Sequence, residues 1–98
     1  MSETHACGRT TRRTDEEKTR LMHRLNRIEG QVRGLKAMLD KDAYCNDILI
    51  QASAAQSALK AFERELLRAH LAGCVARDLR EGHDETIDEL ADTIGRLI

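Results

Sequence analysis

Three residues of this chain carry side chains that bind soft or borderline metal ions: Cys45, His70 and Cys74. His70 and Cys74 are four positions apart, so on a helix they share one face and can hold one ion together. Cys45 precedes His70 by 25 residues, which on one continuous helix is roughly 38 Å at about 1.5 Å per residue. Cys45 then cannot reach the pair of its own chain, although it could reach the pair of an antiparallel partner. The spacing therefore suggests a metal site that exists only in an oligomer.

The donor set of two thiolates and one imidazole limits the choice of metal. Zinc normally takes four ligands in tetrahedral geometry, whereas three soft ligands suit Cu(I). Zinc or another divalent metal would fit if water, His83, His5 or Cys7 completed the shell. A lone buried cysteine is often only a small apolar residue, so the pattern alone leaves metal binding open.

The composition predicts an all-α fold that presents these ligands on helices. The chain has 98 residues, no proline and two aromatic residues, and a helical hairpin of this size buries little core alone, which favours an oligomer. We expect a flexible tail over 1–14 and one domain over 15–98. No signal peptide or apolar run of membrane-spanning length is visible, so we expect a cytoplasmic protein with no membrane partner. In a reducing cytoplasm, cysteines more often bind metal or do redox chemistry than form disulfides.

Three helices are predicted, over about 15–40, 44–80 and 84–97. Thr14 can cap the first helix, with Glu17 at the capping-box position. The polar break at 40–42 separates the first two helices, and Gly82 is a plausible C-terminal cap for the second. Gly73 lies inside the second helix, which we expect to continue because helix-forming residues resume at once.

Charge is uneven along a chain whose net charge is −1. Residues 1–36 hold nine Lys or Arg against five Asp or Glu, whereas residues 74–98 hold three against seven. Arg20, Arg24 and Arg27 form a basic stripe at helical spacing. A second basic row lies along the next helix, where the flanking Glu63 and Glu65 weaken its positive charge. Such a stripe is often only a solvated face, but arginine can also bind phosphate in bidentate fashion.

Several segments together resemble the copper-sensitive operon repressor (CsoR/RcnR) family of DNA-binding metal sensors. They are HRLNRIEGQVRGLKAML at 23–39, DAYCNDILIQASAAQSALK at 42–60 and HLAGC at 70–74, followed by an acidic third helix. The resemblance covers about residues 18–97. It implies a three-helix protomer that dimerises in antiparallel fashion and pairs again into a homotetramer, in agreement with the spacing argument above.

The resemblance also implies the residues of the metal site. The ligands of the family fall on Cys45 of one subunit and on His70 and Cys74 of its partner, and this set points to Cu(I). Tyr44 occupies the position of an outer-shell tyrosine. Glu89 is the candidate for an outer-shell glutamate, although the match needs a one-residue gap, so that Asp88 stays an alternative. A carboxylate there would accept from the second nitrogen of His70 and fix its tautomer.

For DNA, the resemblance implies an allosteric repressor that binds operator DNA as apo-protein and is released by Cu(I). The residues carried over are basic and lie on the first two helices: Arg20, Arg24, Arg27 and Arg33, with Lys60 and Arg64 less firmly. Phosphate contacts and DNA shape would dominate the recognition of this DNA.

Two other functions compete with this one. A persulfide- or thiol-sensing repressor of the same fold could use Cys45 and Cys74 as a reversible cross-link, but His70 and Tyr44 count against it. A copper buffer or chaperone would share the metal site without binding DNA. An enzyme is disfavoured because no nucleophile–base pair or cofactor loop is visible.

Overall fold

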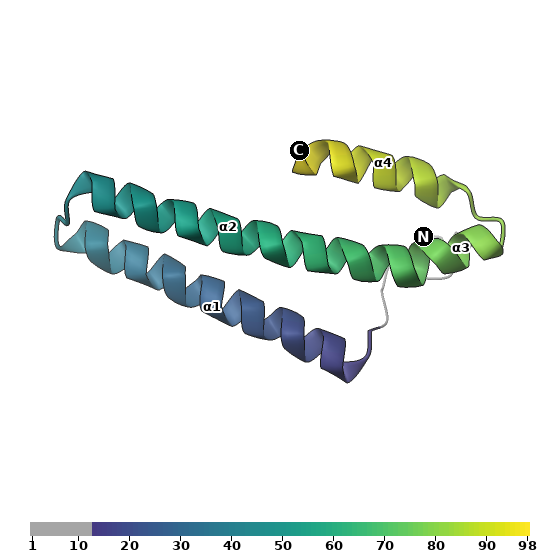
Figure 1. Cartoon of the computed structure of the whole chain (residues 1–98), viewed down its shortest axis with the longest axis horizontal. Helices are drawn as coiled ribbons and strands as arrows, with labels where there is room; N and C mark the ends of the chain where they lie inside the picture. The colour runs from purple at the N-terminus through teal and green to yellow at the C-terminus, as the bar shows by residue number, and fades with distance from the viewer. Residues whose placement is uncertain (1–12) are drawn as a thin grey trace. The chain divides into compact units, whose positions relative to one another are not determined.

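The computed structural model describes residues 13–98, and every regular element in this range is helical (Figure 1). The elements are α1 (Asp15–Asp40), α2 (Cys45–His70), the π-helical turn η1 (Leu71–Val75), α3 (Ala76–Arg80) and α4 (Glu85–Leu97). Because α2, η1 and α3 follow one another directly, they are the second of the three predicted helices. The predicted all-α, three-helix protomer is confirmed. His5, Cys7 and almost all of the predicted tail lie outside the described residues.

The start of α1 shows the predicted capping box. The Glu17 backbone N–H donates to Thr14 Oγ1 at 3.0 Å, and the Thr14 N–H donates to Glu17 Oε1 at 3.2 Å. These bonds satisfy donors that the first turn of a helix leaves without an intrahelical partner.

Residues 13–66 form one of two compact units, in which α1 and most of α2 make an antiparallel hairpin (Figure 1). The turn is a Schellman motif with Asp42 in the left-handed conformation (φ 55°). The Ala43 N–H donates to the Met38 carbonyl at 2.9 Å, and the Asp42 N–H donates to the Leu39 carbonyl at 3.1 Å. The sequence located this break, but not the left-handed aspartate that forms it.

The hairpin covers little of its own apolar surface. Leu21 is the only buried residue of α1, and α2 has none. Apolar side chains of α1 are only partly covered, since Val32 remains 45% and Leu39 69% exposed. Large apolar side chains of α2 are exposed as well, among them Leu49, Ile50 and Leu59. One chain therefore leaves apolar surface on both helices uncovered.

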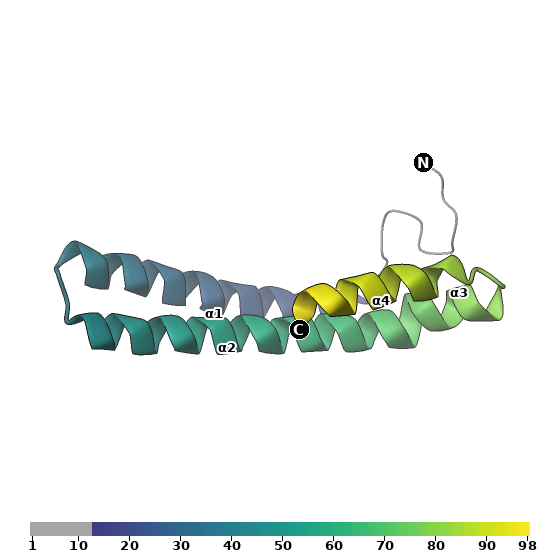
Figure 2. The same ribbon diagram turned by 90° about the horizontal axis from the view of Figure 1, so that it is seen from above.

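The second unit includes residues 67–98, which hold the end of α2, η1, α3 and α4. Gly82 (φ 83°) forms the turn, and the His83 N–H donates to the Asp78 carbonyl at 2.8 Å, again as in a Schellman motif. Figure 2 shows the chain reversing between α3 and α4 at this turn. Among the described residues of this unit, the buried side chains are Cys74, Val75, Asp78, Thr86 and Leu90. None of the described helices is long and apolar enough to span a membrane.

A hydrogen bond in the middle of this core ties α4 to α3. Thr86 Oγ1 donates to Asp78 Oδ2 at 2.7 Å, and both side chains are almost fully buried. We expect T86V to lower the free energy of unfolding by about 1–3 kcal/mol, the usual cost of removing one partner of a buried hydrogen bond. Urea denaturation at fixed protein concentration measures the change. T86S keeps the hydroxyl and is the control; equal losses in both variants would show that the bond contributes nothing.

Candidate metal centre and basic surface

The first candidate metal ligand lies at the start of α2. Cys45 is the first residue of this helix, and its thiol is free and exposed. Tyr44 immediately precedes it and is 72% exposed. The Tyr44 carbonyl accepts from the N–H groups of Asp47 at 3.0 Å and Ile48 at 3.2 Å, which fixes the helix start at this point. The helix thus presents one thiol to solvent at its amino end.

The other two candidate ligands lie where α2 ends. His70 is the last residue of α2 and is partly exposed, whereas Cys74 lies in η1 and is only 3% exposed. Single π-helical turns inside α-helices are frequent at functional sites. The sequence predicted a continuous helix here but not its change of winding, for which Gly73 was the only signal. The sulfur of Cys74 is disulfide-bonded in this structure, so Cys74 could bind a metal only after reduction to the thiol.

The chain does not bring the three candidate ligands together. Helix α2 has 26 residues without interruption and is therefore roughly 39 Å long. Among the described residues, no group of three or more His, Cys, Asp or Glu side chains lies close enough to hold a metal ion. The donor types fit a soft metal, but each end of α2 supplies only part of a coordination shell.

The expected outer shell stays a prediction. Glu89 is exposed on α4, and its backbone carbonyl accepts from Thr93 Oγ1 at 3.1 Å. Within residues 13–98, no hydrogen bond joins the Glu89 carboxylate to His70, and Asp88 is exposed as well. Neither acid is placed at the metal site by the contacts of one chain.

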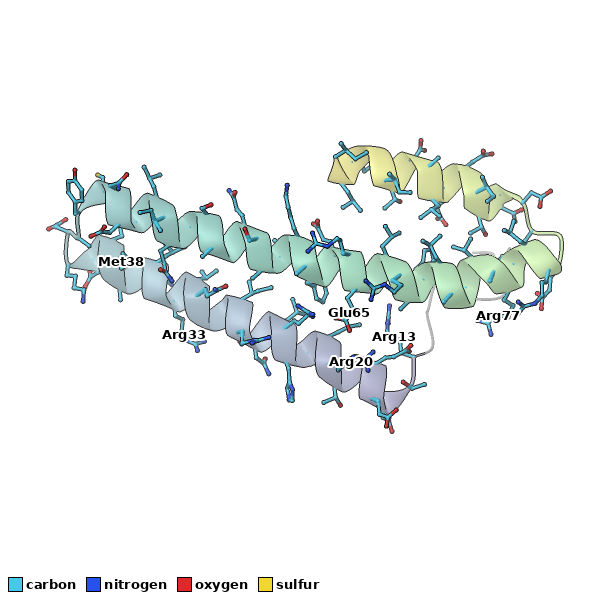
Figure 3. The ribbon with its side chains drawn as sticks, in the orientation of Figure 1. Arg13, Arg20, Arg33, Met38, Glu65 and Arg77 are labelled. Atoms are coloured by element: carbon cyan, nitrogen blue, oxygen red, sulfur yellow. The ribbon has the colours of Figure 1, made fainter. Side chains whose placement is uncertain are left out.

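Two arginines of the predicted basic stripe share one carboxylate. The Arg20 Nε donates to Glu65 Oε2 at 3.1 Å, and the Arg24 Nε donates to Glu65 Oε1 at 2.6 Å. Figure 3 shows Arg20 and Glu65 pointing toward each other from α1 and α2. Hydrogen bonds from Arg20 and Arg24 lower the pKa of Glu65 below its ordinary value of 4.5. Glu65 therefore accepts hydrogen bonds from two arginines of α1, a contact that helical spacing in the sequence did not predict.

The remaining basic candidates are exposed. Arg33 points away from α2 in Figure 3. Arg27 lines a hollow of about 250 Å³ together with Arg24, Gln31 and Ala58. Arg27, Arg33, Lys60 and Arg64 make no hydrogen bond or ion pair with any other residue in the described range, so their charges face solvent.

Comparison with known proteins identifies the family of this chain. Residues 17–96 match the family described as metal-sensitive transcriptional repressor. The chain belongs to this family, and the resemblance found in the sequence is confirmed. The members of the family are transcriptional repressors rather than enzymes.

Individual relatives agree with this assignment. The copper-sensing transcriptional repressor CsoR of Bacillus subtilis is 46% identical over 86 residues, with 87% of this chain and 85% of CsoR covered. RicR of Mycobacterium tuberculosis, also a copper-sensing transcriptional repressor, is 42% identical, with 85% and 90% covered. The crystal structure of the copper-sensing repressor CsoR with Cu(I) from Geobacillus thermodenitrificans superimposes with a TM-score of 0.84 at 46% identity, covering 89% of this chain and 92% of that one.

The arginine–glutamate cluster makes stability depend on pH. Because the folded-state pKa of Glu65 is lowered, its contribution to stability is fully present above about pH 4.5 and is lost as the pH falls through the lowered pKa. We expect the free energy of unfolding of the wild type to exceed that of E65Q at pH 7, and this difference to shrink below pH 4.5. Chemical denaturation across this range measures it, with E63Q as the matched control. A wild-type advantage over E65Q that is the same at pH 3 and pH 7 would contradict the assignment.

Proposed function

We propose that this protein is a Cu(I)-responsive transcriptional repressor that binds operator DNA without metal and is released when copper binds between subunits. The observation that carries the proposal is the position of Cys45 and the His70/Cys74 pair at opposite ends of one uninterrupted helix. In a chain of the metal-sensitive repressor family, this arrangement supplies two half-sites. An antiparallel partner would complete both of them, as two-fold symmetry requires.

Copper is the metal that this donor set favours. Cys45 of one subunit with His70 and Cys74 of its partner supplies two thiolates and one imidazole, a soft three-ligand set suited to Cu(I) rather than to tetrahedral zinc. The relatives at 42–46% identity are copper-sensing repressors. Tyr44 and Glu89 would form the outer shell, where a carboxylate could orient His70. Zinc or another divalent metal remains the alternative for the titrations to distinguish.

The uncovered apolar surface supports the proposed assembly. A single chain exposes Val32, Leu39, Leu49, Ile50 and Leu59. Exposed apolar surface of this kind marks sites of association. An antiparallel homodimer would bury part of it while aligning the half-sites, and pairing of dimers into a homotetramer would bury more. The helix that separates the ligands would then also form the dimer core.

The DNA partner would be held by the basic residues of α1 and α2. Arg20, Arg24, Arg27 and Arg33, with Lys60 and Arg64, would neutralise phosphates, repeated over the subunits of the assembly. Phosphate contacts position a protein on DNA, while DNA shape can supply specificity where no recognition helix reads bases. Such a repressor would act in the cytoplasm, where bacterial DNA lies.

Copper and DNA would be linked through the same helix. Copper binding would draw the two half-sites together and favour a helix arrangement with lower DNA affinity. By thermodynamic linkage, DNA must weaken copper binding by the same factor, typically about 5–150-fold in allosteric proteins.

Loss of Cys45 tests the metal site. We expect C45A to bind Cu(I) at least about 100-fold more weakly than the wild type, since even outer-shell changes typically lower metal affinity by about 10–100-fold. The measurement is a titration of fully reduced protein against a competing Cu(I) chelator, because Cys74 must be a thiol. N46A changes the exposed neighbour and should keep wild-type affinity. Equal Cu(I) affinity of C45A and the wild type would refute the copper site.

The DNA contacts are tested with R27Q. We expect weaker binding to a duplex carrying the promoter of the protein's own operon. The DNA-binding constant falls with salt, and a plot of its logarithm against the logarithm of the salt concentration has a negative slope. We expect R27Q to make this slope shallower by about 1 for each protomer whose Arg27 contacts a phosphate. Copper affinity should not change. K36Q is the control, because Lys36 is an exposed lysine of α1 that is not among the predicted DNA-contacting residues. If the apo-protein fails to bind DNA at low salt but still binds Cu(I), the protein is a copper buffer rather than a repressor.

A further inference from the structure

Glu65 engages Arg20 and Arg24 in a way that leaves most of each guanidinium group unused. Both bonds to the carboxylate come from the Nε atoms, at 3.1 Å and 2.6 Å. Neither arginine has any other hydrogen bond or ion pair with a residue in the range 13–98. The two Nη groups of each side chain, which form the outer edge of the guanidinium, therefore stay available for an oxyanion.

Exposure shows which side of the cluster faces outward. The side chain of Arg20 is 62% exposed and that of Arg24 is 37% exposed, whereas that of Glu65 is only 18% exposed. The carboxylate is thus less exposed than the two guanidinium groups. Because it contacts their Nε atoms, it does not occupy the outer edges that an incoming anion would meet.

The surroundings of Arg24 provide a place for such an anion. Arg24 lines the hollow of about 250 Å³ that Arg27, Gln31 and Ala58 complete. Two guanidinium groups at one hollow, one of them fixed by Glu65, make a concave basic surface. The free charge of the cluster is net positive, because two arginines share one carboxylate.

We propose that Glu65 is a positioning residue that holds Arg20 and Arg24 with their outer edges toward two phosphates of the DNA backbone. This inference rests on the proposed function, since it assigns the support of the DNA-contacting arginines. Glu65 itself does not touch DNA. It acts through the two arginines of α1.

Two opposing effects decide whether Glu65 strengthens or weakens DNA binding by the arginines. A long arginine side chain loses rotamer freedom when it binds phosphate, and a side chain that is already held loses less. Against this, the carboxylate repels phosphate. That repulsion acts across the guanidinium group, whose positive charge lies between the carboxylate and the phosphate and offsets it. Because of this offset, we expect the positioning contribution to prevail.

The test compares two glutamates of the same helix. Glu63 makes no hydrogen bond or ion pair with another residue in the described part of the chain, so E63Q removes one negative charge without releasing an arginine. E65Q removes the same charge and also loosens Arg20 and Arg24. With a fluorescently labelled promoter duplex at fixed salt, we expect E65Q to bind roughly three- to tenfold more weakly than E63Q, from the ordering of rotamer-rich side chains. Equal or tighter binding by E65Q would overturn the proposal.

A double-mutant cycle separates positioning from a general structural effect. If Glu65 acts through Arg24, R24Q should weaken binding less in the E65Q background than in the wild type. Additive effects of E65Q and R24Q would contradict the proposal. Far-UV circular dichroism and the Cu(I) affinity of each variant confirm that fold and metal site are intact.

Retention on immobilised heparin keeps this proposal distinct from the repressor function. If the wild type binds no promoter DNA, the repressor function fails, but the salt needed for elution from heparin still reports how the arginines are presented to a polyanion. Elution of E65Q at lower salt than E63Q would support positioning in that case too. Elution at equal or higher salt would refute it.

Discussion

The length of one uninterrupted helix is the constraint on which the rest of this structure depends. Helix α2 carries Cys45 at its first residue and His70 at its last, and a helix of 26 residues cannot fold back to join its own ends. Under the proposed function, this rigid element divides the soft ligand set into two half-sites. Under the proposed function, copper binding becomes a reaction between subunits rather than within one.

The same helix connects the metal chemistry to the basic surface. Glu65 lies on α2 and fixes Arg20 and Arg24 of α1 through Nε hydrogen bonds. A protein with net charge −1 can thus concentrate positive charge on one local surface, because the acids are concentrated near the C-terminus. Under the proposed function, a change in α2 would reach the arginines through the carboxylate that they share, and this contact would link metal binding to DNA binding.

Local signals made most of the fold predictable from sequence. Thr14 and Glu17 marked the first helix, and Gly82 marked the end of the second, because caps and turns depend on a few neighbouring residues. The π-helical winding of η1 and the Glu65 cluster were not foreseen. The cluster joins residues 41 and 45 positions apart, and helical spacing along one segment carries no information about such partners. The intersubunit ligand set remains a prediction from spacing and resemblance.

The most direct test of the central claim is complementation between two variants that each lack one half-site. C45A and C74A are prepared in reduced form, and Cu(I) stoichiometry is measured for each alone and for an equal mixture refolded together. If the site lies between antiparallel subunits, neither variant binds tightly alone. The mixture recovers about a quarter of the wild-type sites, because half of the dimers are mixed and one of their two sites is intact. No recovery in the mixture, or wild-type binding by either variant alone, would contradict a site shared between subunits.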